Sequence, residues 1–336
     1  MSSTSTSPPP SARHHHPLRH SPLYPSDEFE IEAQYNYDVI RTQFCAKLPT
    51  PASPAFLPSS SLILEGKHVR LTPLNMEKHG ASLFHHLGPA EDGVAWGGSN
   101  CASGRSMNWL VQTKGPYRTR EQFDGSFKPL VNVPIDDPDS ALHVFFRHQF
   151  YAWEVVKSKK LQSSDADDDV DKHRHSIVGT GALFRCDPKN RVIEIGHLAF
   201  CPAHLQGTTA STESFFLLFR YCFRDLGYRR VEWKTNSQNT KSRQAALRLG
   251  FNFEGVFRQL LMYERENQQD HQLGDETRNR DTAWYGMYDK DWFGFLENGY
   301  LNYLKQFDND DEGVEGNKKL MECLIDEQKK SCEQTK

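Results

Sequence analysis

The sequence predicts an α/β protein, a mixed β-sheet with helices packed on it. Two observations support this: three consecutive strand signals joined by hairpin-type connections, and then the order helix, strand, helix, strand, strand. Hairpins give antiparallel pairs, whereas a helix between two strands permits a parallel crossover, so the sheet should contain both kinds of pairing. The 336 residues are 37% apolar and 12% aromatic, which is enough for a packed core.

The first half of the chain supplies the antiparallel part. An alternating apolar run closed by a proline predicts a strand at 68–74, and helical spacing of apolar residues follows at 76–87. Apolar runs at 150–156, 176–184 and 191–200 predict three more strands. Asp, Pro and Asn residues join the last two runs, and this turn chemistry favours a hairpin.

The second half supplies the helices that follow strands. Residues 212–226 form an apolar-rich helical pattern ended by a glycine, and residues 239–249 repeat that arrangement. Strand signals lie between and after these helices, at 230–234, 251–263 and 282–288. The chain therefore alternates strand and helix here, as a mixed sheet requires.

A Gly-rich, aromatic stretch at 88–127 separates the first helix from the later strands. It contains Trp96, Trp109 and Tyr117 and is expected to be a long loop. Long aromatic loops often line ligand sites, so these three side chains are predicted to bind the substrate. Capping one end of the core explains the same aromatics equally well.

Composition divides the chain into one domain with two tails. Residues 1–60 are Ser-, Pro- and His-rich and are expected to be a disordered extension, and residues 306–336 are expected to be an acidic, charged tail. The domain is placed at 61–305, with polar insertions near 158–175 and 264–281. The net charge of −4 equals that of the C-terminal tail, so the body is neutral. Without a basic stripe, no nucleic-acid partner is expected.

Neither a membrane partner nor a metal site is expected. No apolar run approaches the ~18 residues of a spanning helix, and the N-terminus has no apolar secretory segment. The seven cysteines are scattered and contain no C-x-x-C pair, which predicts reduced thiols in the cytoplasm. The acid-free, Arg-containing N-terminus leaves a mitochondrial presequence as the alternative, although its prolines oppose the required helix.

The segment between the strand at 191–200 and the next helix is a candidate anion site. The first N–H groups of a helix lack partners and carry the positive end of its dipole, so a phosphate can bind there without a lysine. The residues expected to contribute are Gln206, Gly207, Thr208, Thr209, Ala210 and Ser211. An ordinary N-cap is the structural alternative. The chain has no P-loop or dinucleotide fingerprint, which disfavours an NTPase and a dehydrogenase.

Five segments, in a consistent order and spacing, make the assignment more specific. They lie at 194–196, 206–211, 226–233, 239–251 and 254–258. Together they resemble the GNAT superfamily of N-acetyltransferases, and within it the ribosomal-protein N-terminal acetyltransferases, the RimJ/RimL-like branch. The resemblance covers about 64–292 and implies the acyl-CoA N-acyltransferase fold. In that fold a mixed six- to seven-stranded sheet is flanked by helices, and acetyl-CoA lies in a V-shaped splay between central strands.

The resemblance also implies a reaction and residue roles. Acetyl-CoA donates its acetyl group to a primary amine, on a protein N-terminus, a lysine or a small molecule, by direct attack in a ternary complex. The amine must first lose a proton, and Glu194 is the expected base. Ser242 is the expected proton donor to the leaving thiolate. The backbone at Leu198 and Phe200 is expected to bind the acyl donor, and Asn239 its pantetheine arm.

Each of these roles has a structural alternative. Glu194 has Arg185 and Arg191 nearby in sequence as ion-pair partners, Asn239 is a good N-cap, and Ser242 is an ordinary first-turn serine. One departure from the family loop pattern, [RQ]-x-x-G-x-[GA], is that Thr209 and Ser211 occupy the small-residue positions. This departure favours a second hypothesis, a catalytically degenerate CoA-binding scaffold that uses its tails as docking segments.

Two further chemistries are weaker. Tyr285 and Tyr288 on the last strand are alternative acids, although tyrosines there usually pack locally. His197 and Cys201 suggest an acyl-cysteine route. That route is disfavoured because no other histidine is obviously placed to activate Cys201, and buried cysteines are usually inert.

Overall fold

The computed structural model describes residues 55–87, 119–131, 148–156, 177–201, 204–262, 279–307 and 316–334. The strands are β1 (Leu64–Glu65), β2 (Val69–Pro73), β3 (His148–Val155), β4 (Ile177–Asp187), β5 (Val192–Phe200), β6 (Arg230–Asn236), β7 (Asn252–Met262) and β8 (Asn279–Tyr288). The α-helices are α2 (Met76–Leu87), α3 (Arg120–Val131), α5 (Thr209–Arg220), α6 (Thr240–Arg248), α7 (Asp289–Asp291), α8 (Glu297–Lys305) and α9 (Gly316–Glu333). Two π-helical turns, η5 (Tyr221–Asp225) and η8 (Trp292–Leu296), follow α5 and α7.

All eight strands form one sheet in the order β1-β2-β3-β4-β5-β6-β8-β7. Neighbouring strands are antiparallel except β5 and β6, which run parallel because α5 crosses over between them. The predicted mixed sheet with flanking helices is confirmed. The sheet has eight strands rather than six or seven because the two-residue β1 pairs with β2, and so short a strand has no periodic signal.

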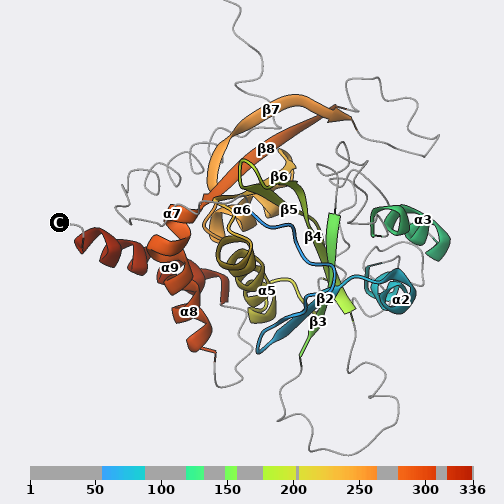
Figure 1. The fold of residues 1–336 in the computed structure, drawn as a ribbon, viewed down its shortest axis with the longest axis horizontal. Helices are drawn as coiled ribbons and strands as arrows, with labels where there is room; N and C mark the ends of the chain where they lie inside the picture. The colour runs from blue at the N-terminus through green and yellow to red at the C-terminus, as the bar shows by residue number, and fades with distance from the viewer. Residues whose placement is uncertain are drawn as a thin grey trace, which may run out of the picture.

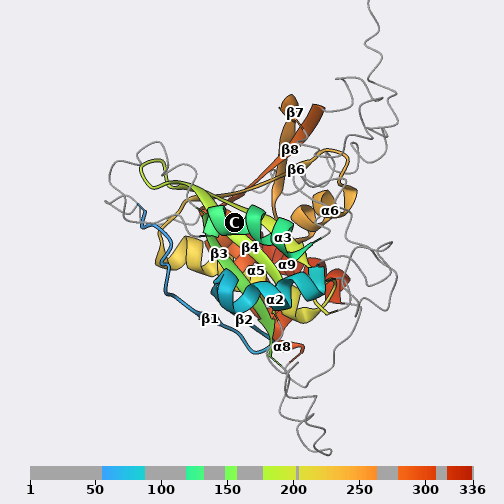
Figure 2. The same ribbon diagram turned by 90° about the vertical axis from the view of Figure 1, so that its right-hand side faces the viewer.

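Helices cover both faces of the sheet (Figure 1). α2 and α3 pack on β4 and β3, and α5 lies on the opposite face with α8 and α9 outside it. Figure 2 looks onto α2 and α3 and shows α5 and α9 behind the sheet. The parallel pair therefore lies in the middle of the molecule, where the β5–α5 connection can carry a site.

A cluster of aromatic rings fixes α5 against the sheet. Phe215 in α5 lies 5.6 Å from Trp153, 5.7 Å from Phe200 and 5.6 Å from Trp233, measured between ring centroids. These partners come from β3, β5 and β6, and all but Phe200 are buried. Contacts with three strands hold the middle of α5 in a fixed position relative to β5 and β6.

The expectation of a loop throughout 88–127 is wrong where α3 begins. Arg120 donates to Asp124 at 2.6 Å, one helical turn later, and Phe123 is buried against Phe84 with ring centroids 5.6 Å apart. The Gly and Pro content of this segment concealed its helical spacing. Trp96, Trp109 and Tyr117 lie outside the described residues, so their substrate-binding role stays a prediction.

Part of the acidic tail is helical and packed. α9 lies against α8, and its Leu320 and Leu324 are buried. Within the described ranges, none of the helices has the length and apolar character needed to cross a membrane. The five cysteines in those ranges, Cys186, Cys201, Cys222, Cys323 and Cys332, are free thiols. The cytoplasmic compartment stays a prediction.

Candidate active site

The parallel strands β5 and β6 pair over only part of their length. Val192 to Ile195 face Arg230 to Trp233, after which β5 continues to Phe200 and β6 to Asn236 without pairing to each other. We call these unpaired ends the splay. A bulge in β5 marks its start, because the register with β4 shifts between Gly196 and Ala199 and His197 has φ = 52°.

The backbone of Phe200 faces the splay. The Cys201 N–H donates to the Val178 carbonyl at 2.8 Å, which makes the neighbouring Phe200–Gly179 pair the non-hydrogen-bonded kind. The N–H and C=O of Phe200 therefore point away from β4. Leu198 lies within the bulge, and its side chain packs over Gly181. The predicted main-chain contact is thus available at Phe200.

Main-chain donors lie where the chain enters α5, at residues 204–210 (the α5 entry turn). Thr208 caps the helix, because its hydroxyl accepts from the Ser211 N–H at 3.2 Å. Gly207 has φ = 78°, a conformation that glycine adopts without strain. Among the described residues, the N–H groups of Gly207, Thr209 and Ala210 have no hydrogen-bond acceptor. Three such donors at a helix N-terminus are suited to bind an anion.

The side chains at this turn leave those donors uncovered. Gln206 is directed to the Phe200 carbonyl, at 3.3 Å, and the Thr208 hydroxyl donates to the Leu205 carbonyl at 2.8 Å. Thr209 and Ser211 are both buried, at 5% and 8% exposure, in the first turn of α5. The two departures from the family pattern therefore point into the protein.

The second helix after a parallel strand, α6, also begins at the splay. Asn239 is its N-cap and accepts from the Ser242 N–H at 3.1 Å. The Ser242 hydroxyl accepts from the indole Nε1 of Trp233 at 3.1 Å, and Trp233 is the last residue of β6 that pairs with β5. This contact uses a lone pair of Ser242 and leaves its hydroxyl proton to be donated.

Glu194 lies two residues before the splay and is only 3% exposed. Its Oε2 accepts from Arg185 at 2.9 Å and from Lys234 at 2.8 Å, while Oε1 is directed toward Gly196. Burial raises the pKa of the Glu194 carboxyl, and the two cations offset part of that rise. The pairing with Arg185 is one of the structural alternatives expected from the sequence.

These pairs continue across the sheet. Glu232 accepts from Lys234 at 2.7 Å and from Arg230 at 2.8 Å, and Arg230 also donates to Glu254 at 2.6 Å. The sheet network, as we call Arg185, Glu194, Lys234, Glu232, Arg230 and Glu254, joins β4 to β7 and balances three acids against three bases. Cross-strand pairs of this kind fix side-chain positions on one face.

Known proteins share this architecture. An acetyltransferase (GNAT) domain model matches residues 102–252. A GCN5-related N-acetyltransferase from Brucella melitensis is 30% identical over 82% of this chain and 100% of its own, with a TM-score of 0.58. The chain belongs to the GNAT family of N-acetyltransferases.

Other GNAT structures are more distant. A GNAT-family protein from Chromobacterium violaceum is 27% identical over 74% of this chain and 96% of its own, with a TM-score of 0.51. RimL, a ribosomal L7/L12 α-N-protein acetyltransferase, is 16% identical over 70% and 99%, with a TM-score of 0.43, too distant to support an argument about the acceptor. A comparison with curated protein sequences found no match.

The two tyrosines considered as alternative acids make packing and hydrogen-bond contacts within this GNAT domain. Tyr285 is fully buried and packs on Phe253, with ring centroids 5.3 Å apart. The Tyr288 hydroxyl donates to Glu254, and burial together with that carboxylate raises the pKa of Tyr288 to about 12. Tyr288 lies opposite Arg230, at the end of β6 away from the splay.

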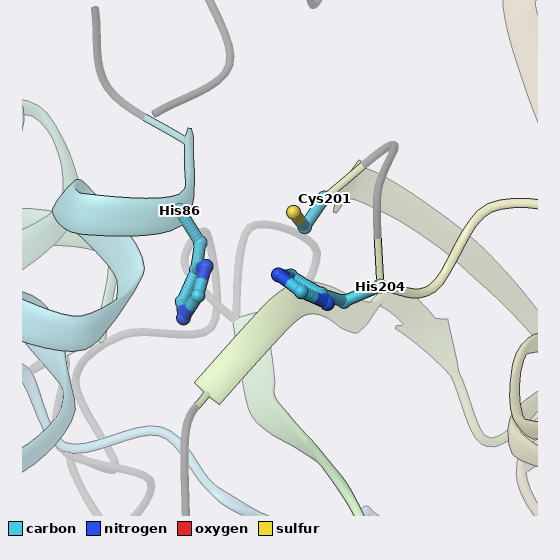
Figure 3. Close-up of side chains that lie close together, drawn as sticks. All are labelled: His86, Cys201 and His204. Atoms are coloured by element: carbon cyan, nitrogen blue, oxygen red, sulfur yellow. The ribbon is translucent and has the colours of Figure 1, made fainter. Parts of the chain in front are cut away.

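The histidine environment of Cys201 differs from the sequence expectation. His197 lies between the rings of Phe150 and Phe184, at 5.3 and 4.7 Å, and does not accompany the thiol. Instead His86 and His204 lie beside Cys201 (Figure 3). The expectation that no other histidine is obviously placed to activate Cys201 is therefore wrong. His204 lies only three residues after Cys201 in the sequence, whereas His86 comes from α2 and could not be found from local spacing.

Proposed function

We propose that this GNAT enzyme transfers an acetyl group from acetyl-CoA to a primary amine by direct attack in a ternary complex. The observation that supports this best is the splay between two parallel strands, with the N-termini of α5 and α6 both at its open end. Helix N-termini at the carboxyl ends of adjacent parallel strands form a phosphate-binding crevice.

The α5 entry turn fits the diphosphate of CoA. The N–H groups of Gly207, Thr209 and Ala210 supply three donors, and a Cβ added at Gly207 would meet nothing within 4 Å. The space above the turn is therefore open to a ligand. The pantetheine arm would lie along β5, where the Phe200 N–H is available to its amides.

Two side chains would handle the protons. The amine loses a proton to Glu194 through a water, since the carboxylate is too buried for direct contact with a bulky acceptor. A raised pKa makes that carboxylate a stronger base. The neutral amine nitrogen then bonds to the thioester carbonyl carbon, and the C–S bond breaks. The Ser242 hydroxyl gives its proton to the departing thiolate and regains one from the acetylated nitrogen through water, so that the products are the amide and CoA with a free thiol.

One observation favours the scaffold alternative. Both cations of Glu194 bind the same oxygen, which is how a purely structural carboxylate would be held. The buried orientation of Thr209 and Ser211 argues against that alternative, because it leaves the α5 entry turn uncovered.

Thiol release from acetyl-CoA, measured against a panel of amines, separates the two functions. The panel contains peptides with free N-termini, lysine peptides with blocked N-termini, polyamines and small amines. The proposal predicts amine-dependent release with at least one class, and that class identifies the acceptor. Tight CoA binding without turnover on any amine would establish the scaffold instead.

A further inference from the structure

Three side chains with metal-binding atoms converge beside the α5 entry turn. His86 is the penultimate residue of α2, Cys201 directly follows β5, and His204 opens the turn itself. Their ligand atoms all lie within 4.8 Å of one another, and the three side chains point toward a common centre (Figure 3). His86 and Cys201 are buried, whereas His204 is exposed.

The position of His86 is fixed from within α2. Ser82 lies one helical turn earlier on the same face, accepts from the Ile177 N–H at 2.8 Å and donates to the Ile177 carbonyl at 3.3 Å. These bonds attach α2 to the beginning of β4. His86 is thereby placed over the neighbouring end of β5.

The position of Cys201 is fixed by its backbone. Its N–H donates to Val178, the residue after Ile177, and its carbonyl accepts from Leu205 at 3.0 Å and Gln206 at 3.3 Å. The same β4 segment thus anchors both the helix that carries His86 and the strand end that carries Cys201. The approach of His86 to Cys201 therefore follows from the fold.

The donor set suits zinc. One thiolate and two imidazoles are the ligands that Zn²⁺ prefers, and three protein ligands leave a fourth position for water. Tetrahedral Zn²⁺ requires ligand atoms about 3.3–3.6 Å apart. The three ligand atoms lie within 4.8 Å of one another, so a side-chain movement of about 1 Å brings them to that spacing. The exposed His204 has the freedom to make that movement.

We propose that His86, Cys201 and His204 form a zinc site that fastens α2 to the α5 entry turn. The bound zinc would hold Cys201 and His204 in place. These residues directly precede the N–H groups of the α5 entry turn that are proposed to bind the diphosphate. None of the three residues takes part in the proposed acetyl transfer. The existence of the site can therefore be tested without an activity assay.

Metal titration of the purified full chain tests this proposal. Because His14, His15 and His16 form a second potential chelator, all three are replaced by alanine in every sample. We expect one Zn²⁺ per chain, and with Co²⁺ a near-ultraviolet thiolate-to-cobalt charge-transfer band. Cys201→Ser should abolish that band. His204→Ala, at an exposed position that folding tolerates, should weaken Zn²⁺ binding by at least about 100-fold.

The matched control is His85→Ala, which removes the exposed neighbour of His86 on α2 and should leave the affinity unchanged. The proposal is overturned if no Zn²⁺ binds, or if binding and the cobalt band survive both Cys201→Ser and His204→Ala. A covalent acetyl group on Cys201 after incubation with acetyl-CoA alone, detected by intact mass, would also overturn it. That result would assign the cluster to nucleophile activation.

Discussion

Glu194 has one oxygen held by two cations and a second oxygen directed toward Gly196 at the splay. Removing a carboxylate that only stabilises the sheet network should affect stability, whereas removing one that also accepts a proton should lower kcat. Its cross-strand neighbour Glu232 offers the comparison, because it belongs to the same network and shares Lys234. Replacing each of these two glutamates with glutamine therefore separates the structural role from the catalytic one.

Glu194→Gln should lower kcat by at least about 100-fold with little change in the KM for acetyl-CoA, whereas Glu232→Gln should affect stability more than kcat. The pKa of Glu194 is raised, and a base must be deprotonated. Wild-type kcat should therefore fall as pH drops through a value above the ordinary glutamate pKa. Equal losses of kcat in both variants, or a flat pH profile, would reduce Glu194 to a network member.

Ser242 is tested by removing its hydroxyl. Ser242→Ala should lower kcat about tenfold and destabilise the protein by about 1 kcal/mol, because the buried Trp233 indole loses its acceptor. Ser242→Thr retains a hydroxyl and should therefore keep most of the wild-type kcat and stability. Steady-state kinetics and thermal unfolding measure the two effects. Loss of stability with unchanged kcat would show that Ser242 serves only Trp233.

At the level of elements, the α5 entry turn should be sensitive to negative charge. Gln206→Glu should raise the KM for acetyl-CoA at least about tenfold, because a carboxylate beside the donors of Gly207 and Ala210 repels the diphosphate, and added salt should reduce the effect. Gln244→Glu, an exposed position on α6, is the matched control. If the two variants have the same KM, the diphosphate binds elsewhere.

The elements themselves were predictable to different degrees. Short apolar runs located the seven longer strands, and α2 ends where its pattern does. The two-residue β1 was too short to leave a signal, and glycine and proline hid α3. The splay followed from family resemblance alone, since no local pattern reveals where two parallel strands stop pairing.

The site residues were also predictable to different degrees. The N-cap of α5 and the N-cap Asn239 follow from residue type, and both are observed. The second partner of Glu194, Lys234, and the approach of His86 to Cys201 depend on contacts between distant segments, which no local spacing encodes. The sequence therefore identified residues of the β5–α5 and β6–α6 connections and missed those that the sheet brings to them.

For the whole molecule, one buried carboxyl should make stability depend on pH. Burial raises the pKa of Asp291 from 3.8 to about 6, although Asn252 donates to it at 3.1 Å. The native state then holds a proton that the unfolded state has lost. The stability from this group is present below about pH 4 and is lost as pH rises toward 6, an effect of about 3 kcal/mol.

Asp291→Asn should therefore stabilise the protein at pH 7 by up to about 3 kcal/mol and flatten its stability between pH 4 and 6. Urea unfolding at a series of pH values measures both effects. Asp225→Asn, at an exposed position, should change neither. A variant less stable than the wild type at pH 7 would mean that the Asp291 charge is stabilising.

Hydrogen exchange with and without CoA tests most directly whether main-chain donors at the end of β5 and the start of α5 hold the acyl donor. Peptides that cover residues 200–211 should exchange more slowly when CoA is saturating, because the N–H groups of Phe200, Gly207, Thr209 and Ala210 gain acceptors. Peptides from β7 and α9 should be unaffected. Unchanged exchange across 200–211 in the presence of bound CoA would contradict the proposed site.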